Sequence, residues 1–329
     1  MAQPQSIDEG LFVPINGEEQ WITIRGRDLR NPVLLWLHGG PGIAMSGQAP
    51  LFFDWEKDFT IIQWDQPGGG ATFAKNMAKG EGPLTRARYT KDGIAVAEFV
   101  RDHLHTDKMV LMGISWGTEL GLRMIHERPE LFSAYVGTAQ VVDGPRGNKL
   151  GYELALKAAR ERGDQTAITE LTKAGPPPYK KVEDFFVRQK YVFPPGLPAS
   201  PEEKAATARF AKLLSAPPPP DAHYIAKDMP QFDGVKQFLA VQAQVLPEAG
   251  KFEAVKLGTR FPMPMFFFEG ENDINTPTAL AKEFFDEITA PAKGFEIIKG
   301  AGHNTIIFSD EILSLLDKNV RPLVTAGPQ

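Results

Sequence analysis

The chain has 329 residues, of which 42% are hydrophobic and 23% are charged, an ordinary mixture for a globular protein with a large core. The formal net charge is -5 and no basic stripe stands out, so nucleic acid is not an expected partner. The absence of cysteine excludes disulfides, thiolate metal sites and a cysteine nucleophile.

The N-terminal stretch MAQPQSIDEG is polar and acidic, without the basic start and apolar core of a signal peptide. No apolar run approaches the length needed to span a membrane. We therefore expect a cytoplasmic protein with no membrane partner, with the reservation that a removed leader would escape this argument. The length suits one large domain, or one domain with a substantial insertion.

Predicted strands alternate with predicted helices over the first 142 residues. The dipeptide Asn16-Gly17 favours a tight hairpin turn between the first two strands. Apolar runs such as VLLWL are typical of strands buried on both faces of a parallel sheet. The predicted strands are 11–15, 19–26, 33–37, 59–64, 108–113 and 132–139, and the predicted helices are 91–104 and 118–129. This alternation indicates βαβ units and a mainly parallel sheet.

The alternation stops after Val142, and residues 143–258 contain helical patterns without a convincing strand. Proline clusters (GPPPY, FPPGLP and APPPPD) separate these patterns. Their regular apolar positions favour an inserted helical domain over a disordered linker. The predicted helices are 151–163, 167–175, 181–191, 201–214 and 237–246.

The strand and helix alternation then resumes. Strands are predicted at 262–270 and 294–300, and a closing helix at 305–323. The helix 276–288 is expected to open with Thr276 as its cap and Pro277 at the first helical position. The prediction is a core of residues 1–142 and 259–329, split by a helical insertion at 143–258.

Ser115 lies in GISWG, between a predicted strand and a predicted helix. This is the context of a G-x-S-x-G elbow, in which a strained turn exposes a nucleophilic serine. Glycine is expected two residues before and after the serine because side chains there would clash across the turn. The pattern alone is common by chance, so the other strand-end loops must supply the partners of a nucleophile.

The loop LHGGPG (37–42) follows another strand. Its backbone N–H groups, with that of Trp116, are candidates for binding a developing oxyanion. His38 leads into the glycines, and we expect it to brace the loop by hydrogen bonding instead of acting as a base.

Two late loops carry an acid and a histidine. Asp273 follows a strand in EGEND, where it orients a histidine or, alternatively, caps the next helix as Asn275 also could. Glu271 is a competing acid in the same loop. Of six histidines, only His303 lies on a late strand-end loop beside glycines. The order Ser115, Asp273, His303 is that of an α/β-hydrolase catalytic triad.

The motifs His38-Gly39-Gly40-Pro41-Gly42, Asp65-Gln66-Pro67-Gly68-Gly69-Gly70 and GISWG resemble the HGGPG, DQRG and GGSWG segments of the proline iminopeptidase family of α/β-hydrolases. The resemblance runs through about 10–142 and 259–325. It implies Ser115 as nucleophile, His303 as base and Asp273 as its orienter, with oxyanion donors at Gly40 and Trp116. It also implies that 143–258 is a cap that selects substrate.

The sequence departs from the motifs of this family at two places that concern substrate binding. The arginine of DQRG is Pro67 here. The family's R-I-E-N-H-Y-F segment, whose glutamate holds a substrate amine, corresponds to VRQKYVF (187–193) without a glutamate at the comparable place. The substrate pocket is expected to be formed by Gly39, Pro41, Trp116, Glu183, Phe186 and Lys190.

The expected activity is that of a serine hydrolase acting on a small molecule or short peptide, without a metal or organic cofactor. The first candidate is iminopeptidase-like cleavage of a small amide, an N-terminal residue or an ester. The alternatives are a carboxylesterase or lactone hydrolase and a non-hydrolytic ligand receptor. The oligomeric state is left open.

Overall fold

One eight-stranded sheet organises the protein, here a computed structural model that describes residues 5–179 and 181–325. The strand order is β1-β2-β4-β3-β5-β6-β7-β8, and only the pairs β1–β2 and β2–β4 are antiparallel. The strands are β1 (Ile7–Ile15), β2 (Glu18–Gly26), β3 (Val33–Leu37), β4 (Thr60–Trp64), β5 (Met109–Ile114), β6 (Phe132–Thr138), β7 (Met265–Gly270) and β8 (Lys293–Ile298). The predicted mainly parallel sheet is confirmed. The ends of the chain at 1–4 and 326–329, which include the start of the polar N-terminal stretch, lie outside the described residues.

The first hairpin follows its turn residues. Asn16 and Gly17 have φ values of 48° and 94°, the left-handed conformations that a two-residue type I′ turn requires. The side chains of the central strands alternate between the two faces of the sheet, because successive residues of a strand point to opposite sides. In β3, Leu35 and Leu37 join one hydrophobic cluster, whereas Leu34 and Trp36 join the cluster on the other face.

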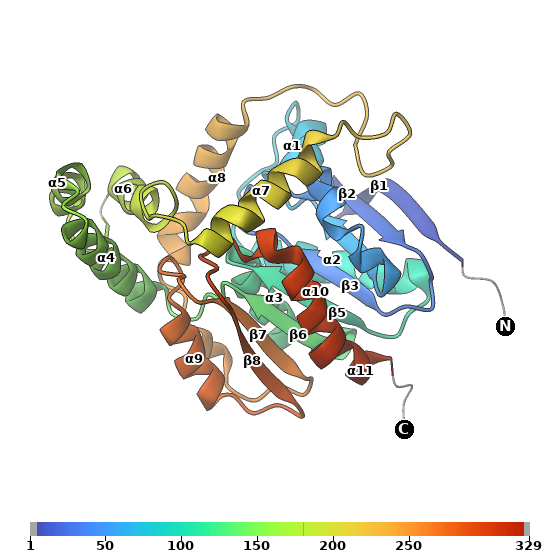
Figure 1. The fold of residues 1–329 in the computed structure, drawn as a ribbon. Coiled ribbons are helices and arrows are strands. Elements are labelled where there is room, and N and C mark those ends of the chain that lie inside the picture. Colours follow the sequence, from blue (N-terminus) through green and yellow to red (C-terminus); the bar gives the residue numbers. More distant parts are fainter. Residues whose placement is uncertain (1–4, 180, 326–329) are drawn as a thin grey trace.

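Helices cover both faces of the sheet (Figure 1). The first cluster contains residues of α2 (Arg86–Leu104), α3 (Trp116–Glu127) and α9 (Thr278–Glu287), and the second contains residues of α10 (Ser309–Leu315). The sheet is therefore covered by helices on both faces. The loops that follow the carboxyl ends of its parallel strands lie together along one open edge of the sheet.

The chain between β6 and β7 is helical. Among the residues described there, the structure has no strand and contains α4 (Gly144–Glu161), α5 (Gln165–Ala174), α6 (Val182–Val192), α7 (Pro201–Ser215) and α8 (Gly234–Ala249). Figure 1 shows α4, α5 and α6 standing away from the sheet, whereas α7 and α8 lie over the core. Within residues 5–179 and 181–325, no helix has both the length and the apolar character needed to cross a membrane.

Several element boundaries differ from the predictions. A short helix α1 (Gly70–Asn76) was not predicted, because it begins in a glycine cluster that reads as a loop. The predicted closing helix is interrupted: 3-10 turns precede α10, and a π-helical stretch at 316–320 leads into α11 (Arg321–Val324). Thr276 was wrongly predicted as a helix cap, because α9 begins at Thr278 with Pro277 at the cap position and no side-chain cap bond.

Candidate active site

Ser115 lies on a strained turn between β5 and α3. Its backbone has φ 52° and ψ -120°, a conformation that is costly for a residue with a side chain. The flanking glycines make the turn possible. A Cβ on Gly113 would lie 2.5 Å from the carbonyl oxygen of Gly117, and one on Gly117 would lie 2.2 Å from that of Leu37. The predicted clash across the turn is confirmed for Gly113, whereas a side chain at Gly117 would instead clash with the end of the neighbouring strand β3.

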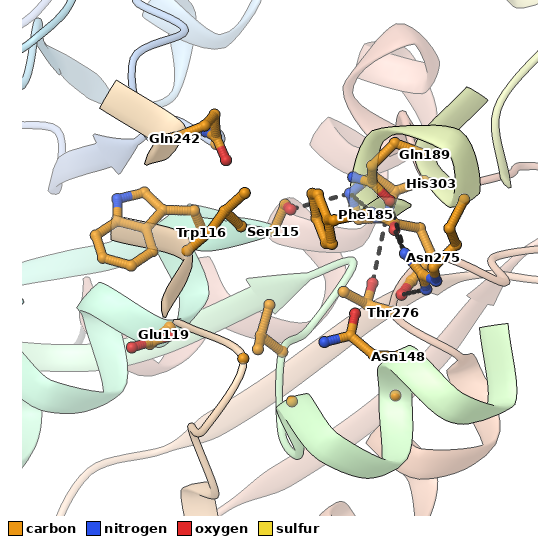
Figure 2. A pocket seen from close by; sticks show the side chains of 18 of the residues that line it. Ser115, Trp116, Glu119, Asn148, Phe185, Gln189, Gln242, Asn275, Thr276 and His303 are labelled. Atoms are coloured by element: carbon orange, nitrogen blue, oxygen red, sulfur yellow. Dashed lines mark hydrogen bonds between the residues drawn. The ribbon is translucent and has the colours of Figure 1, made fainter. Parts of the chain in front are cut away.

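Ser115, His303 and Asp273 form a continuous hydrogen-bonded chain. The Ser115 Oγ lies 2.9 Å from His303 Nε2, and His303 Nδ1 lies 2.8 Å from Asp273 Oδ2. Figure 2 shows the Ser115 hydroxyl pointing at the His303 ring. The three side chains come from the carboxyl ends of β5, β7 and β8, which the parallel sheet brings together. The sequence order and the geometry thus agree.

Asp273 is buried and accepts further hydrogen bonds from its own loop. The Asn275 and Thr276 backbone N–H groups donate to Oδ1 at 2.8 and 3.0 Å, and the Thr276 hydroxyl donates to Oδ2 at 2.8 Å. These donors compensate the carboxylate for its lost hydration. Asp273 therefore both organises this loop and contacts His303. The competing Glu271 instead accepts from the Gly300 N–H at 2.8 Å.

Thr276 and Asn275 were not predicted as partners of the histidine. Thr276 Oγ1 lies 3.2 Å from His303 Nδ1, and Asn275 Nδ2 lies 3.1 Å from His303 Nε2 (Figure 2). The available signal was the run of polar residues directly after β7. That run read equally well as the start of a helix, so the sequence did not separate the two roles.

His38 braces the glycine loop, as expected. The Gln66 N–H donates to Nε2 at 3.1 Å, so the proton resides on Nδ1, which donates to the Gly39 carbonyl at 2.8 Å. Burial lowers the pKa of His38 to about 4. A neutral imidazole with both nitrogens bonded to backbone is a structural group and not a general base.

The glycine loop lies directly against the serine. A Cβ on Gly39 would lie 3.5 Å from Ser115 Cβ. Gln242 of α8 donates to the Pro41 carbonyl at 2.8 Å, and the Trp116 indole N–H donates to Gln66 Oε1 at 3.0 Å. These bonds fix the loop and the residue after Ser115. The use of the Gly40 and Trp116 backbone N–H groups as oxyanion donors stays a prediction.

The chain from α4 to α8, called here the 144–249 region, also contacts His303 and its loop. The Phe193 ring packs edge-on against the His303 ring, with centroids 5.2 Å apart. At the start of α7, the Ser200 hydroxyl donates to the Gly300 carbonyl at 2.6 Å. Buried Glu203 lies beside Gly302, where a Cβ would come within 2.9 Å of its carboxylate. Residues of the chain between β6 and β7 thus support the loop that carries His303.

A cavity of about 1320 Å³ opens at Ser115 and His303. Its walls come from the glycine loop, from α4, α6 and α8, and from the loop after β7. Most of the lining is apolar, and Figure 2 shows Phe185 and Gln189 beside the histidine. Of the predicted pocket residues, Gly39, Pro41, Trp116 and Phe186 line this cavity, as does Gly40.

Glu183 and Lys190 were wrongly predicted to line the pocket. Both are exposed and absent from the cavity wall. They are seven residues apart in α6 and share one face of that helix. Lys190 Nζ pairs there with Glu170 at 2.8 Å. Phe185 and Gln189, on the opposite face of α6, line the cavity, as does Phe186.

Metal-ligand clusters are absent from the described residues: no group of three or more His, Cys, Asp or Glu side chains there is arranged to hold a metal ion. His303 and Asp273 supply one imidazole and one carboxylate, which are already bonded to each other.

Comparison with known proteins gives the class of the fold. Residues 32–174 match the family described as alpha/beta hydrolase fold. A proline iminopeptidase-related protein from Thermus thermophilus superposes with a TM-score of 0.63 over 96% of this chain and 99% of that one, at 18% identity. The chain has the α/β-hydrolase fold.

Its sequence relatives are named for aminopeptidase activity. The probable aminopeptidase YbaC of Bacillus subtilis (strain 168) is 27% identical over 292 residues, which is 88% of this chain and 88% of the relative. The proline iminopeptidase of Lactobacillus helveticus is 30% identical over 54% of this chain and 59% of its own length. The predicted resemblance to proline iminopeptidases is confirmed.

Proposed function

We propose that this protein is a serine hydrolase that cleaves a small ester or amide through an acyl-enzyme. The observation that carries the proposal is the chain of hydrogen bonds from Ser115 through His303 to Asp273 at the wall of a large cavity. A nucleophile, a base and a group that orients the base are the minimum set for this chemistry.

In the proposed first step, His303 Nε2 takes the proton of the Ser115 hydroxyl as Oγ attacks the substrate carbonyl carbon. Asp273 holds the Nδ1 proton, which keeps Nε2 free to accept and stabilises the imidazolium that forms. The imidazolium then protonates the leaving group, and the acyl group stays on Ser115. Water repeats the sequence and releases the acid.

The tetrahedral oxyanion needs donors on the opposite side of the serine. We assign these to the Gly40 and Trp116 backbone N–H groups, because the glycine loop contacts Ser115 and Trp116 starts α3. Losing one such donor typically costs about 3–4 kcal/mol in the barrier. Helices α4–α8, residues 143–258 with their connections, would act as the cap that shapes the substrate pocket.

Aminopeptidase action and ester hydrolysis make different demands on the cavity. A free N-terminal amine requires an available carboxylate. The two carboxylates in the cavity wall are both engaged: Glu119 with Arg86 and Arg123, and Asp143 with the Arg146 backbone at the start of α4. The names of the relatives support a peptidase, whereas these engaged carboxylates favour an ester or another substrate without a free amine.

The test is labelling of Ser115 with a fluorophosphonate probe, followed by mass spectrometry of the labelled peptide. We expect wild type to be labelled and Ser115→Ala to be neither labelled nor active, with turnover reduced at least about a thousandfold. A variant that keeps near wild-type turnover would exclude Ser115 as the nucleophile. Unchanged thermal unfolding of the variant is the control for folding.

The same preparation separates the two substrate classes. Prolyl and other aminoacyl naphthylamides are compared with short acyl nitrophenyl esters, using Ser115→Ala as the blank. Ester cleavage without prolyl amide cleavage would reject the iminopeptidase candidate. Efficient prolyl amide cleavage would instead show that one of the engaged carboxylates becomes available when substrate binds.

A further inference from the structure

We propose that the preferred substrates of this site carry a carboxylate, which is bound by Arg188 together with Tyr179 in the wall of the cavity. This inference rests on the proposed function and specifies the substrate class of the same site. It starts from two buried donors, the Arg188 Nε–H and the Tyr179 hydroxyl, that have no acceptor among residues 5–179 and 181–325.

Arg188 is a buried cation close to the triad. Its side chain comes from α6, is 1% exposed and lines the cavity. Nη1 donates to Asn275 Oδ1 at 2.8 Å and to Gln189 Oε1 at 2.6 Å, and Nη2 donates to the Asn275 carbonyl at 2.9 Å. A glycine in α4 makes room for it, since a Cβ on Gly151 would lie 2.1 Å from Nη2.

No carboxylate of the described residues lies within salt-bridge distance of Arg188, and the Asp273 charge acts on it only from further away. All its hydrogen-bond acceptors are neutral amide oxygens, it forms no salt bridge there, and its Nε–H has no acceptor. Burial lowers the pKa of Arg188 to about 10, which leaves the guanidinium charged at neutral pH. An unpaired buried charge is costly, and natural proteins usually pair it. An anionic substrate would supply the missing partner.

Tyr179 supplies a second unsatisfied donor. Its hydroxyl is buried, has no hydrogen-bond partner among the described residues, and belongs to a residue that lines the same cavity. Burial raises the pKa of Tyr179 to about 12, and the positive charge of Arg188 acts in the opposite direction. The hydroxyl therefore keeps its proton and can donate it to an acceptor oxygen. A tyrosine hydroxyl and a guanidinium are both good partners for a carboxylate.

The remaining charges of the cavity wall have the same sign. Lys149 and Lys181 line the cavity and form no salt bridge among the described residues, whereas Lys251 pairs with Glu248 at 2.7 Å. Both wall carboxylates are engaged, as described above. The uncompensated charges that face a ligand are therefore positive, which disfavours an ammonium group and favours an anion.

Asn275 lies between the Arg188 guanidinium and the His303 imidazole. Its Oδ1 accepts from Arg188, and its Nδ2 lies 3.1 Å from His303 Nε2. The guanidinium is thus separated from the base by a single amide side chain. A carboxylate held there would be close to the carbonyl that Ser115 attacks, as in a monoester or monoamide of a short dicarboxylic acid.

The experiment compares matched esters. The mono-4-nitrophenyl esters of glutaric and adipic acid are measured against the 4-nitrophenyl esters of their monoamides, after subtraction of the rate without enzyme. For wild type, we expect kcat/KM for each carboxylate to exceed that for its carboxamide by roughly 10–100-fold, the effect of a hydrogen bond to a charged group. Equal values, or a preference for the carboxamide, would overturn the proposal.

Variants then assign the preference to its residues. Arg188→Gln should lower the ratio of the two kcat/KM values by roughly 10–100-fold, whereas Lys190→Gln, which removes a cation from the opposite face of α6, should leave the ratio and both rates unchanged. If Arg188→Gln lowers both rates equally and the ratio stays the same, Arg188 only positions Asn275 and the proposal is wrong.

Tyr179→Phe covers the case in which Arg188→Gln does not fold. It removes a hydroxyl without a protein partner among the described residues, so the fold loses no hydrogen bond described there, and we expect the ratio to fall several-fold. An unchanged ratio in Tyr179→Phe would show that the Tyr179 hydroxyl does not bind the substrate carboxylate. Failure of the proposed function gives a different result: neither ester is hydrolysed and Ser115 is not labelled, which overturns both conclusions together.

Discussion

Two histidines at the same edge of the sheet have opposite environments. His303 faces the Ser115 hydroxyl and an acid, whereas His38 is enclosed by backbone groups of the glycine loop. The two imidazoles differ in the hydrogen-bond partners of their ring nitrogens. Both nitrogens of His38 are already engaged, and protonation of Nε2 would break its bond from the Gln66 N–H. His38 therefore makes the stability of the protein depend on pH.

The pKa of His38 falls from 6.5 in the unfolded chain to about 4 in the folded protein because of burial. The unfolded chain consequently binds the proton more readily, and stability is lost as pH falls from about 6.5 towards 4. The full loss is about 3 kcal/mol. We expect His38→Gln to be less stable than wild type at pH 7 and the difference to shrink at pH 4.5. Urea unfolding at both pH values measures it.

Other buried acids titrate in wild type and in the variant alike, so they cancel in this difference. Burial raises the pKa of Asp65 to about 6, for example, in both proteins. A gap between wild type and His38→Gln that does not change between pH 7 and pH 4.5 would contradict the assignment of a neutral His38.

The sequence predicted that Ser115, Asp273 and His303 lie together, but not the residues around them. Ser115, Asp273 and His303 were found because each lies at a strand end, and the topology of a parallel sheet brings strand ends together. Glu183 and Lys190 were wrong because the orientation of α6 about its own axis depends on packing that no local pattern encodes. Arg188 was missed for the same reason: a buried arginine looks like a surface arginine in sequence.

The start of α7 connects a helix of the 144–249 region to the loop of His303. Ser200 Oγ accepts from the Glu203 N–H at 2.9 Å, which caps the helix, and donates to the Gly300 carbonyl at 2.6 Å. One side chain thus stabilises the helix and fixes the loop three residues before the histidine.

We expect Ser200→Ala to destabilise the protein by about 1–2 kcal/mol and to lower kcat several-fold. Asp164→Ala is the matched control, because Asp164 caps α5 by accepting from the Ala167 N–H at 2.9 Å and lies away from that loop. Thermal unfolding and kcat are measured for both variants. Equal effects of the two substitutions on kcat would show that the Ser200 bond does not position His303.

Elements with a strong apolar pattern were predicted, whereas helix α1 was not. The apolar runs of β3 and β5 agree with the prediction to within a residue. Helix α1 has only seven residues and depends on contacts with β2, so its sequence carries little helical signal of its own. The closing helix was predicted as continuous because its apolar spacing persists through the π-helical stretch.

The 144–249 region is attached to the rest of the molecule in two ways. Val241 and Val245 of α8 belong to the main hydrophobic cluster, and Ala206 of α7 belongs to the cluster on the other face of the sheet. Helices α4, α5 and α6 instead share a separate cluster that includes Tyr152, Leu171 and Tyr191. In Figure 1 these three helices stand apart from the sheet. A separate small core permits local opening without global unfolding.

We therefore expect amide hydrogens of α5 to exchange through an opening of α4–α6 with a lower free energy than those of β5. Leu171→Ala, at a fully buried position of the separate cluster, should lower that free energy by about 2–4 kcal/mol and speed exchange in α5 on the order of a hundredfold, while β5 is unaffected. Leu111→Ala in the centre of β5 is the matched control, because it should weaken the whole molecule. Hydrogen exchange read by mass spectrometry measures both. If Leu171→Ala speeds exchange equally in β5, α4–α6 and the sheet unfold together, and the cavity wall that holds Arg188 cannot open independently.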